Sequence, residues 1–120
     1  MAKRILVVDD SAIMREQIRR IIELQKGIEV CAEADDGAEA VRKVEECHPD
    51  LVILDFLMPG MNGLEATRRI RQLEPRLPIL MFTLHQNAQF EHESELAGAD
   101  AVLPKAEGAR LLSVISQLLH

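Results

Sequence analysis

The stretch Asp50-Leu-Val-Ile-Leu-Asp55 decides the fold, because it sets four consecutive apolar residues between two aspartates. A continuous apolar run of this length is typical of a strand that is covered on both faces, as in a parallel sheet. Comparable runs occupy residues 5–8, 30–32, 78–82 and 101–103. Segments with helical spacing separate the runs. This alternation predicts an α/β fold with a five-stranded parallel sheet and helices on both faces.

Local signals place the first three helices between these strands. Apolar side chains recur at helical spacing from Met14, and we expect that helix to end at Gly27. Asp36 with Glu39 three residues later predicts a capping-box start for the second helix. The third helix should begin near Gly63. It should end before Pro75 and Pro78.

Two further helices are expected in the last third of the chain. The segment 86–97 is polar nearly all round, so we expect it to be weakly held and mobile. The last helix should start at about Glu107 and carry a leucine-rich stripe. With 120 residues and no linker or repeat, residues 1–120 are expected to form one domain.

Composition excludes several classes of function. The net charge of −6 argues against nucleic-acid binding by this chain, since that needs clustered basic residues. The cluster of Arg68, Arg69 and Arg71 is interpreted as a solvated helix face. Cys31 and Cys47 lack the spacing of a disulfide framework or a zinc site.

Nothing in the sequence predicts membrane insertion or export. The apolar stretch at residues 5–8 is too short for a signal-peptide core and ends in two aspartates. The longest later apolar stretch falls far short of the roughly 20 residues of a spanning helix. The chain is therefore expected to be cytoplasmic.

Polar residues follow four of the predicted strands. Asp9 and Asp10 come after the first strand, Asp55 ends the third, Thr83 ends the fourth and Lys105 follows the fifth. The carboxyl ends of parallel strands meet at one edge of the sheet, where α/β proteins bind ligands. Each residue alone has an ordinary structural explanation. Together they predict a site.

The residue types at this edge favour magnesium and phosphoryl chemistry. Crowded carboxylates repel one another unless a cation lies among them, and hard oxygen ligands suit Mg²⁺. Lys105 and Thr83 would supply an ammonium and a hydroxyl to phosphoryl oxygens. Since no Cys or activated Ser is suitably placed, a carboxylate is the expected nucleophile, and we choose Asp55.

Five features follow one another along the chain: Ile5-Leu-Val-Val-Asp-Asp10, the quoted run to Asp55, Met58-Pro-Gly-Met-Asn-Gly63, Thr83 and Lys105. In their order and spacing, the chain resembles the CheY-like receiver domains of two-component response regulators over its whole length. The resemblance implies the strand order 2-1-3-4-5. It also implies phosphoryl transfer to Asp55 from a phosphohistidine of a sensor histidine kinase or phosphotransfer protein, without turnover of an external substrate.

The same resemblance implies a role for each site residue. Asp10 and Asp55 would bind Mg²⁺ directly, Asp9 would act through water, and the backbone carbonyl of Leu57 would be a further ligand. Lys105 would pair with the phosphoryl oxygens. Thr83 would shift toward them and move its loop, which is the switch.

The sequence departs from the family pattern near the site. Val102 stands where members often carry an aromatic residue, which puts a readout by ring rotation in doubt. Leu84 stands where a small residue is common, and its bulk could narrow access for the phosphoryl donor. Leu57 and His85 flank the site at positions expected to control the attacking water. An apolar Leu57 predicts a long-lived phosphorylated form.

Other functions remain as alternatives. A Mg²⁺-dependent phosphatase with an aspartate nucleophile needs an Asp-x-Asp motif after the first strand, whereas this chain has Asp9-Asp10-Ser11. A flavodoxin-type carrier needs a phosphate-binding loop there, where Asp9 and Asp10 would repel the anion. The run 58–66 resembles receivers joined to DNA-binding output domains, which leaves open a longer parent protein. A homodimer formed on phosphorylation also stays open.

Overall fold

The structure is a computed structural model that describes residues 1–84 and 87–119. Within these residues five strands form one parallel sheet in the order β2-β1-β3-β4-β5, which confirms the predicted fold class and strand order. The strands are β1 (Lys3–Val8), β2 (Ile28–Ala34), β3 (Leu51–Leu54), β4 (Ile79–Thr83) and β5 (Ala101–Pro104).

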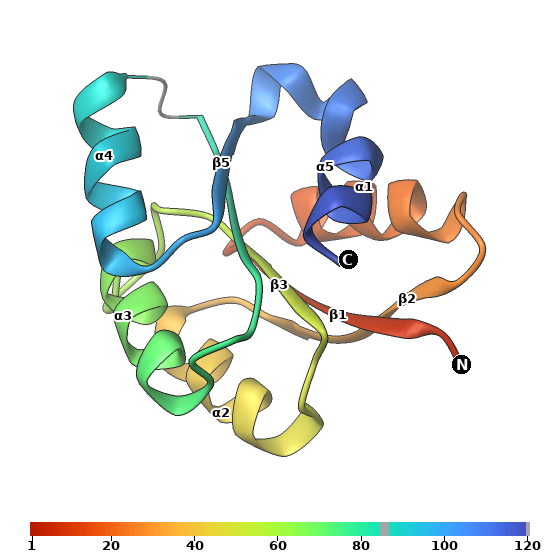
Figure 1. The fold of residues 1–120 in the computed structure, drawn as a ribbon, viewed down its shortest axis with the longest axis horizontal. Helices are drawn as coiled ribbons and strands as arrows, with labels where there is room; N and C mark the ends of the chain where they lie inside the picture. Colours follow the sequence, from red (N-terminus) through yellow and green to blue (C-terminus); the bar gives the residue numbers. More distant parts are fainter. Residues whose placement is uncertain (85–86, 120) are drawn as a thin grey trace.

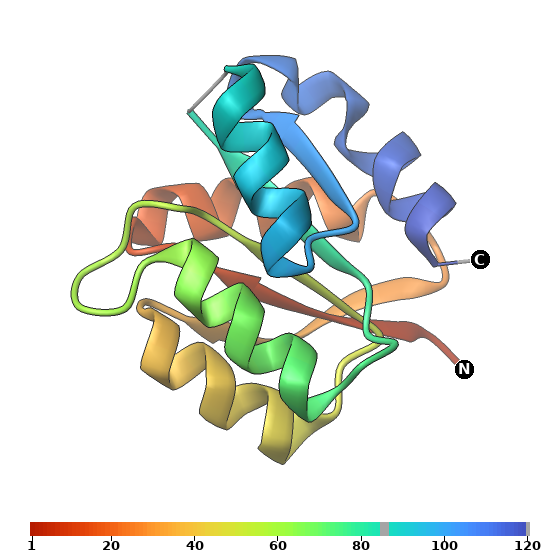
Figure 2. The same cartoon turned by 60° about the vertical axis from the view of Figure 1, so that its left-hand side comes forward.

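Helices cover both faces of the sheet. In Figures 1 and 2, α2, α3 and α4 lie on one side of the strands, and α1 and α5 lie on the other. The bounds are α1 (Ala12–Glu23), α2 (Gly37–Cys47), α3 (Gly63–Leu73), α4 (Ala88–Ala97), a 3₁₀ helix η1 (Lys105–Arg110) and α5 (Leu111–Leu118). None of the helices in the described part of the chain has the length and apolar character needed to cross a membrane.

Side-chain caps explain where four of the helices begin. Ser11, Asp36, Asn62 and Asn87 precede α1, α2, α3 and α4, and each side-chain oxygen accepts a backbone N–H three residues later. Such caps satisfy amide groups that lack a partner within the helix. The predicted start of α2 is confirmed, and Glu39 reaches back to accept the Asp35 N–H at 3.1 Å.

Two predicted helix ends are wrong. The first helix ends at Glu23 with Leu24 as its cap, and Gly27, at φ 90°, instead turns the chain into β2. The last helix does not start at about Glu107. Glu107 has non-helical angles within η1, and α5 begins only at Leu111. The expected start of the fourth helix at Gln86 lies outside the described residues. Among the described residues, α4 begins at Ala88.

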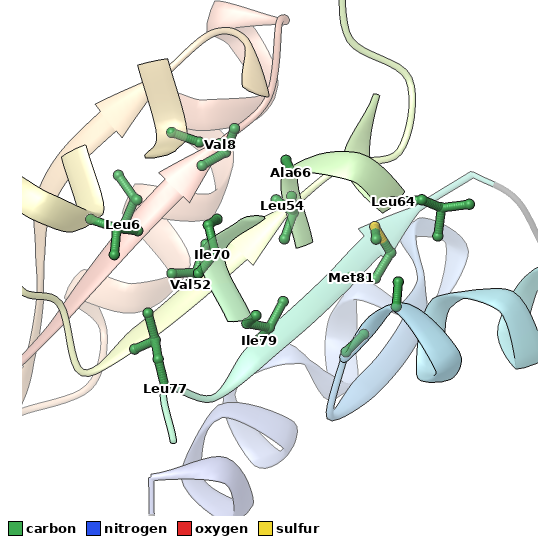
Figure 3. Packing of buried hydrophobic residues seen from close by; sticks show 14 of the residues in the cluster. Leu6, Val8, Val52, Leu54, Leu64, Ala66, Ile70, Leu77, Ile79 and Met81 are labelled. Carbon is green, nitrogen blue, oxygen red and sulfur yellow. The ribbon is translucent and has the colours of Figure 1, made fainter. Parts of the chain in front are cut away.

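Each face of the sheet has its own apolar core. The core under α2, α3 and α4 includes Leu6, Leu54, Ile70 and Met81, which lie along neighbouring strands and α3 in Figure 3. The opposite core joins inward residues of β1, β3, β4 and β5 to α1 and α5. Apolar side chains on both faces leave the strand ends as the place for polar residues.

α4 is attached to the first of these cores by a few residues. Phe90, Ser94 and Ala97 are its buried positions, and Ser94 Oγ donates to the Phe90 carbonyl at 2.9 Å. The Phe90 ring meets Phe56 edge to face at 5.0 Å between centroids. The remaining α4 residues are exposed. Its mobility stays a prediction.

α3 begins against the backbone that carries Asp55. A Cβ on Gly63 would lie 2.3 Å from the Asp55 carbonyl oxygen and 2.7 Å from Phe56 Cα. The Gly63 N–H donates to the Phe56 carbonyl at 2.8 Å. Only glycine allows this close approach, so Gly63 sets how near α3 lies to the end of β3.

Arg71 corrects the prediction of a solvated arginine face. Its side chain is only 23% exposed, whereas Arg68 and Arg69 are exposed. The guanidinium donates to the carbonyls of Gly98, Glu74, Pro75 and Leu77 and to the Asp100 carboxylate. It therefore joins the end of α3 to the turns before β4 and β5.

Replacing Gly63 by alanine should destabilise the protein. The added methyl group would meet backbone rather than a flexible side chain, and overpacking of this kind costs about 1–3 kcal/mol of unfolding free energy. Urea unfolding measures the change. Gly108→Ala is the control, because its Cβ would make ordinary contact with Phe82 at 3.8 Å. Equal stability of both variants would contradict the close-approach argument.

Removing the Arg71 guanidinium should loosen the same end of the molecule. Arg71→Gln cannot reach the carbonyls at Gly98 and Leu77, and half-buried acceptors without donors cost about 1–3 kcal/mol. Thermal unfolding compares it with Arg69→Gln, which loses only an exposed contact to Glu65 at 3.4 Å. Matching melting temperatures for the two variants would show that Arg71 is also a surface residue.

Candidate functional site

The acidic residues meet where the strand order reverses between β1 and β3. Asp9 follows β1 and Asp55 follows β3, and the Asp55 N–H donates to the Val8 carbonyl at 3.1 Å. One carboxylate oxygen from each of Asp9, Asp10 and Asp55 lies within 4.8 Å of the others. Asp9 and Asp55 are buried, at 2% and 7% exposure, while Asp10 is exposed. The predicted convergence of these three residues is confirmed.

Lys105 lies among the buried carboxylates. Its Nζ donates to Asp9 Oδ2 at 2.8 Å and to Asp55 Oδ2 at 3.1 Å, and 9% of the side chain is exposed. Burial by itself lowers the pKa of the ammonium, but the hydrogen bond that it donates to Asp9 and the charges of Asp55 and Asp9 raise that pKa above its usual value. Lys105 therefore stays charged beside Asp55.

Backbone amides hold the other oxygens of the two buried carboxylates. Ser11 N–H donates to Asp9 Oδ1 at 2.9 Å, and Phe56 N–H donates to Asp55 Oδ1 at 2.8 Å. Each carboxylate is thus fixed by one amide and one ammonium. Carboxylate oxygens retain further lone pairs after two such bonds, so both can still accept a ligand.

The donor set fits a magnesium ion. Three carboxylates lie together, and the one ammonium of Lys105 that pairs with two of them leaves an excess of negative charge. Mg²⁺ prefers hard oxygen ligands and keeps several waters. The exposed position of Asp10 leaves the cluster open to solvent on that side.

The remaining predicted residues lie around this cluster. Thr83 is fully buried at the end of β4, in register with Pro104 of β5. Leu57 and Leu84 are 55% and 70% exposed, at the loops after β3 and β4. His85 lies outside the described residues. The strand order therefore places Thr83 beside the strand that leads to Lys105.

Sequence reasoning missed one residue that touches the site. Arg15 of α1 donates from Nη1 to the backbone carbonyl of Asp9 at 2.6 Å and from Nε to Glu33 Oε1 at 3.0 Å. No local pattern marks it, because its partners lie on two different strand ends. The sequence shows that Gly63 lies eight residues after Asp55, but it does not predict that the two residues are in contact.

Known proteins with similar sequences include whole receivers and longer enzymes. Chemotaxis protein CheY of Bacillus subtilis is 39% identical over 121 residues, covering all of both chains. The protein-glutamate methylesterase/protein-glutamine glutaminase of Pyrococcus abyssi is 55% identical over 60 residues. That match covers 50% of this chain and 16% of the relative, so the chain spans a small part of such enzymes.

Solved structures show the same architecture. A LuxR-family response regulator from Aurantimonas sp. SI85-9A1 superposes with a TM-score of 0.95 at 42% identity, covering 99% of this chain and 86% of that one. The response regulator domain of Thermotoga maritima CheB gives 0.92 at 32% identity, covering 99% and 97%.

The family itself is shown by the sequence. Residues 5–116 match the response regulator receiver domain, which confirms the resemblance and does not favour the phosphatase alternative. The fold, the strand order and the full-length similarity to CheY agree with it. The chain belongs to the response regulator receiver domain family, the phosphoacceptor modules of two-component signalling.

Proposed function

We propose that Asp55 is the phosphoryl acceptor of this receiver and that the partner kinase or phosphotransfer protein donates from a phosphohistidine. The observation that carries the proposal is the contact of Asp55 with Lys105 within a cluster of three carboxylates. Asp9 and Asp10 share the acidic cluster, but Asp55 directly follows the central strand β3. Its side chain combines limited exposure with a fixed orientation.

The transfer exchanges one bond for another at phosphorus. A carboxylate oxygen of Asp55 attacks, the phosphorus–nitrogen bond of the phosphohistidine breaks, and the imidazole leaves with the electron pair. The product is an acyl phosphate on Asp55. Hydrolysis of the acyl phosphate ends the signal. Water attacks the phosphorus, the phosphorus–oxygen bond to Asp55 breaks, and phosphate and a proton are released.

Magnesium would be held by Asp9, Asp10, Asp55 and the backbone carbonyl of Leu57. When bound, the ion would neutralise charge that develops on the phosphoryl oxygens. Asp9 is already bonded to Lys105 and Ser11, which supports a contribution through water. Asp10 is exposed and suits direct binding.

Lys105 and Thr83 would contact the phosphoryl oxygens. Lys105 already lies 3.1 Å from Asp55 Oδ2, so its ammonium can move to an added oxygen without crossing the site. Thr83 ends β4 at the same edge of the sheet. A hydroxyl donor there would tie phosphorylation to the position of the loop after β4, which is the proposed switch.

The wider roles follow from this chemistry. We propose that residues 1–120 form one cytoplasmic receiver domain that turns over no external substrate. Its output is a changed surface that a protein partner, a second copy or a DNA-binding domain in a longer parent protein would recognise. A structural neighbour described as a DNA-binding response regulator of the LuxR family, from Staphylococcus aureus, supports the last of these.

Incubation with acetyl phosphate and Mg²⁺ should add one phosphoryl group to the wild type. Asp55→Asn should add none, because an amide is a poor nucleophile. Intact-mass spectrometry reads the gain, and alkali should remove it. Asp35→Asn is the matched control, since Asp35 is an exposed acid after β2 at the same edge. Labelling of Asp55→Asn would place the acceptor elsewhere.

Leu57→Gln should shorten the life of the phosphorylated form. A polar side chain beside Asp55 can hydrogen-bond the attacking water, and a gain of about tenfold in rate corresponds to 1.4 kcal/mol of barrier. Loss of phosphate from purified protein measures the rate. Leu96→Gln makes the same change at an exposed leucine of α4. Rapid loss from the wild type would contradict a protective Leu57.

A further inference from the structure

Arg15 connects the end of β1 to the edge strand β2. Its Nη1 donates to the backbone carbonyl of Asp9 at 2.6 Å, and its Nε donates to Glu33 Oε1 at 3.0 Å. Asp9 is the last buried residue before the exposed Asp10. One guanidinium therefore reaches the turn that carries two of the three clustered carboxylates.

Glu33 is itself held in place from α1. Its second carboxylate oxygen pairs with Arg19, one helical turn after Arg15. The side chains of Arg15 and Glu33 are 19% and 24% exposed, so the contact is mostly shielded from solvent. A planar guanidinium that donates in two directions fixes geometry better than a single ammonium does.

The turn itself has further fixed contacts. The Asp9 N–H donates to the Ala34 carbonyl at 3.1 Å, and Asp9 Oδ1 accepts the Ser11 N–H at 2.9 Å. Arg15 adds the bond to the Asp9 carbonyl, the peptide group that leads into Asp10. The orientation of that peptide sets where the Asp10 carboxylate can lie.

We propose that Arg15, anchored by Glu33, is a positioning residue for the magnesium site, because it holds the Asp9-Asp10 turn in the geometry that binds the ion. The inference rests on the proposed function, since it assigns Asp9 and Asp10 to that ion. Partners that orient metal ligands from outside the ligand set commonly change metal affinity by about 10–100-fold. Because Arg15 acts through the backbone, the low end of that range applies.

The sign of the effect separates positioning from charge. Arg15 is a cation close to a cation site, so deleting its charge should by itself strengthen Mg²⁺ binding. Loss of positioning should weaken binding. The two explanations therefore predict opposite changes for the same substitution, Arg15→Gln.

Isothermal titration calorimetry with Mg²⁺ on the purified chain tests the proposal without any phosphodonor. Arg15→Gln is expected to bind Mg²⁺ about tenfold more weakly than the wild type. Arg20→Gln is the control, because Arg20 is on the same helix, is 75% exposed and, among the residues that the structure describes, pairs with Glu16 on its own helix. It should bind like the wild type. Unchanged or tighter binding by Arg15→Gln would overturn the inference.

Two more variants keep the test independent of folding defects. Arg15→Lys retains the charge but cannot bridge both partners, so it should also bind weakly. Glu33→Gln leaves Arg15 in place without its ionic anchor and should bind several-fold more weakly. In a double-mutant cycle, Arg15→Gln combined with Glu33→Gln should bind like Arg15→Gln alone, since both act along one path. Additive losses would contradict a shared path.

The same titration separates a failure of the proposed function from a failure of the role assigned to Arg15. If the wild type binds no Mg²⁺ and takes no phosphoryl group from acetyl phosphate, the proposed function fails. If the wild type does both and Arg15→Gln matches it in Mg²⁺ affinity, only the role of Arg15 fails. Thermal unfolding of each variant confirms that the affinities compare folded proteins.

Discussion

Repulsion among three carboxylates at one edge of the sheet is the constraint around which this molecule is arranged. Asp9 and Asp55 are buried, where an unpaired charge is costly. The ammonium of Lys105 pairs with both carboxylates. The backbone amides of Ser11 and Phe56 donate to the other carboxylate oxygens of Asp9 and Asp55. The cluster keeps an excess of negative charge toward solvent at Asp10. The fold therefore holds these carboxylates together before any cation binds, and a divalent cation would relieve their repulsion.

The rest of the fold places the strands and the helix that carry the cluster. Apolar cores on both faces hold β1 and β3 side by side, and Gly63 brings α3 against the carbonyl of Asp55. Arg71 ties the opposite end of α3 to the turns before β4 and β5. The Arg71 contacts lie at the amino ends of β4 and β5, away from the ligand-facing groups at the carboxyl ends, whereas Gly63 contacts the backbone of the site itself. Arg71 can therefore be changed separately from the site, and Gly63 cannot.

The sequence predicted what local patterns encode and missed what distant contacts decide. The central strands were clear because burial on both faces makes their apolar runs continuous. β2 is an edge strand with polar Glu29 and Glu33, and its pairing with β1 slips between Ile5 and Leu6, so only its three middle residues were predicted. Gly27 was predicted to end the first helix, but that helix ends at Glu23, and the positive φ of Gly27 belongs to the turn into β2.

The contacts of Arg71 and Arg15 were the main features that the sequence did not predict. In both cases the bonded partner is distant in the sequence. The partners of Arg71 include Gly98, which is 27 residues away, and Arg15 bonds Glu33, which is 18 residues away. A long side chain can lie in solvent or reach a distant carbonyl, and the local sequence is alike in both cases. The site carboxylates were predictable because strand ends converge whatever the helices do.

The proposed readout of phosphorylation would not use the rotation of a ring at position 102. Val102 has no aromatic ring, and the nearby aromatic contact is the Phe56–Phe90 pair, which joins the residue after Asp55 to α4. Lys105 follows directly on Pro104, which lies in register with Thr83. In the proposed switch, a pull on Lys105 or Thr83 would be shared by the ends of β4 and β5 through the backbone. Because η1 leaves helical geometry at Glu107, that displacement would be absorbed there before it reached α5, and the response would fall on α4.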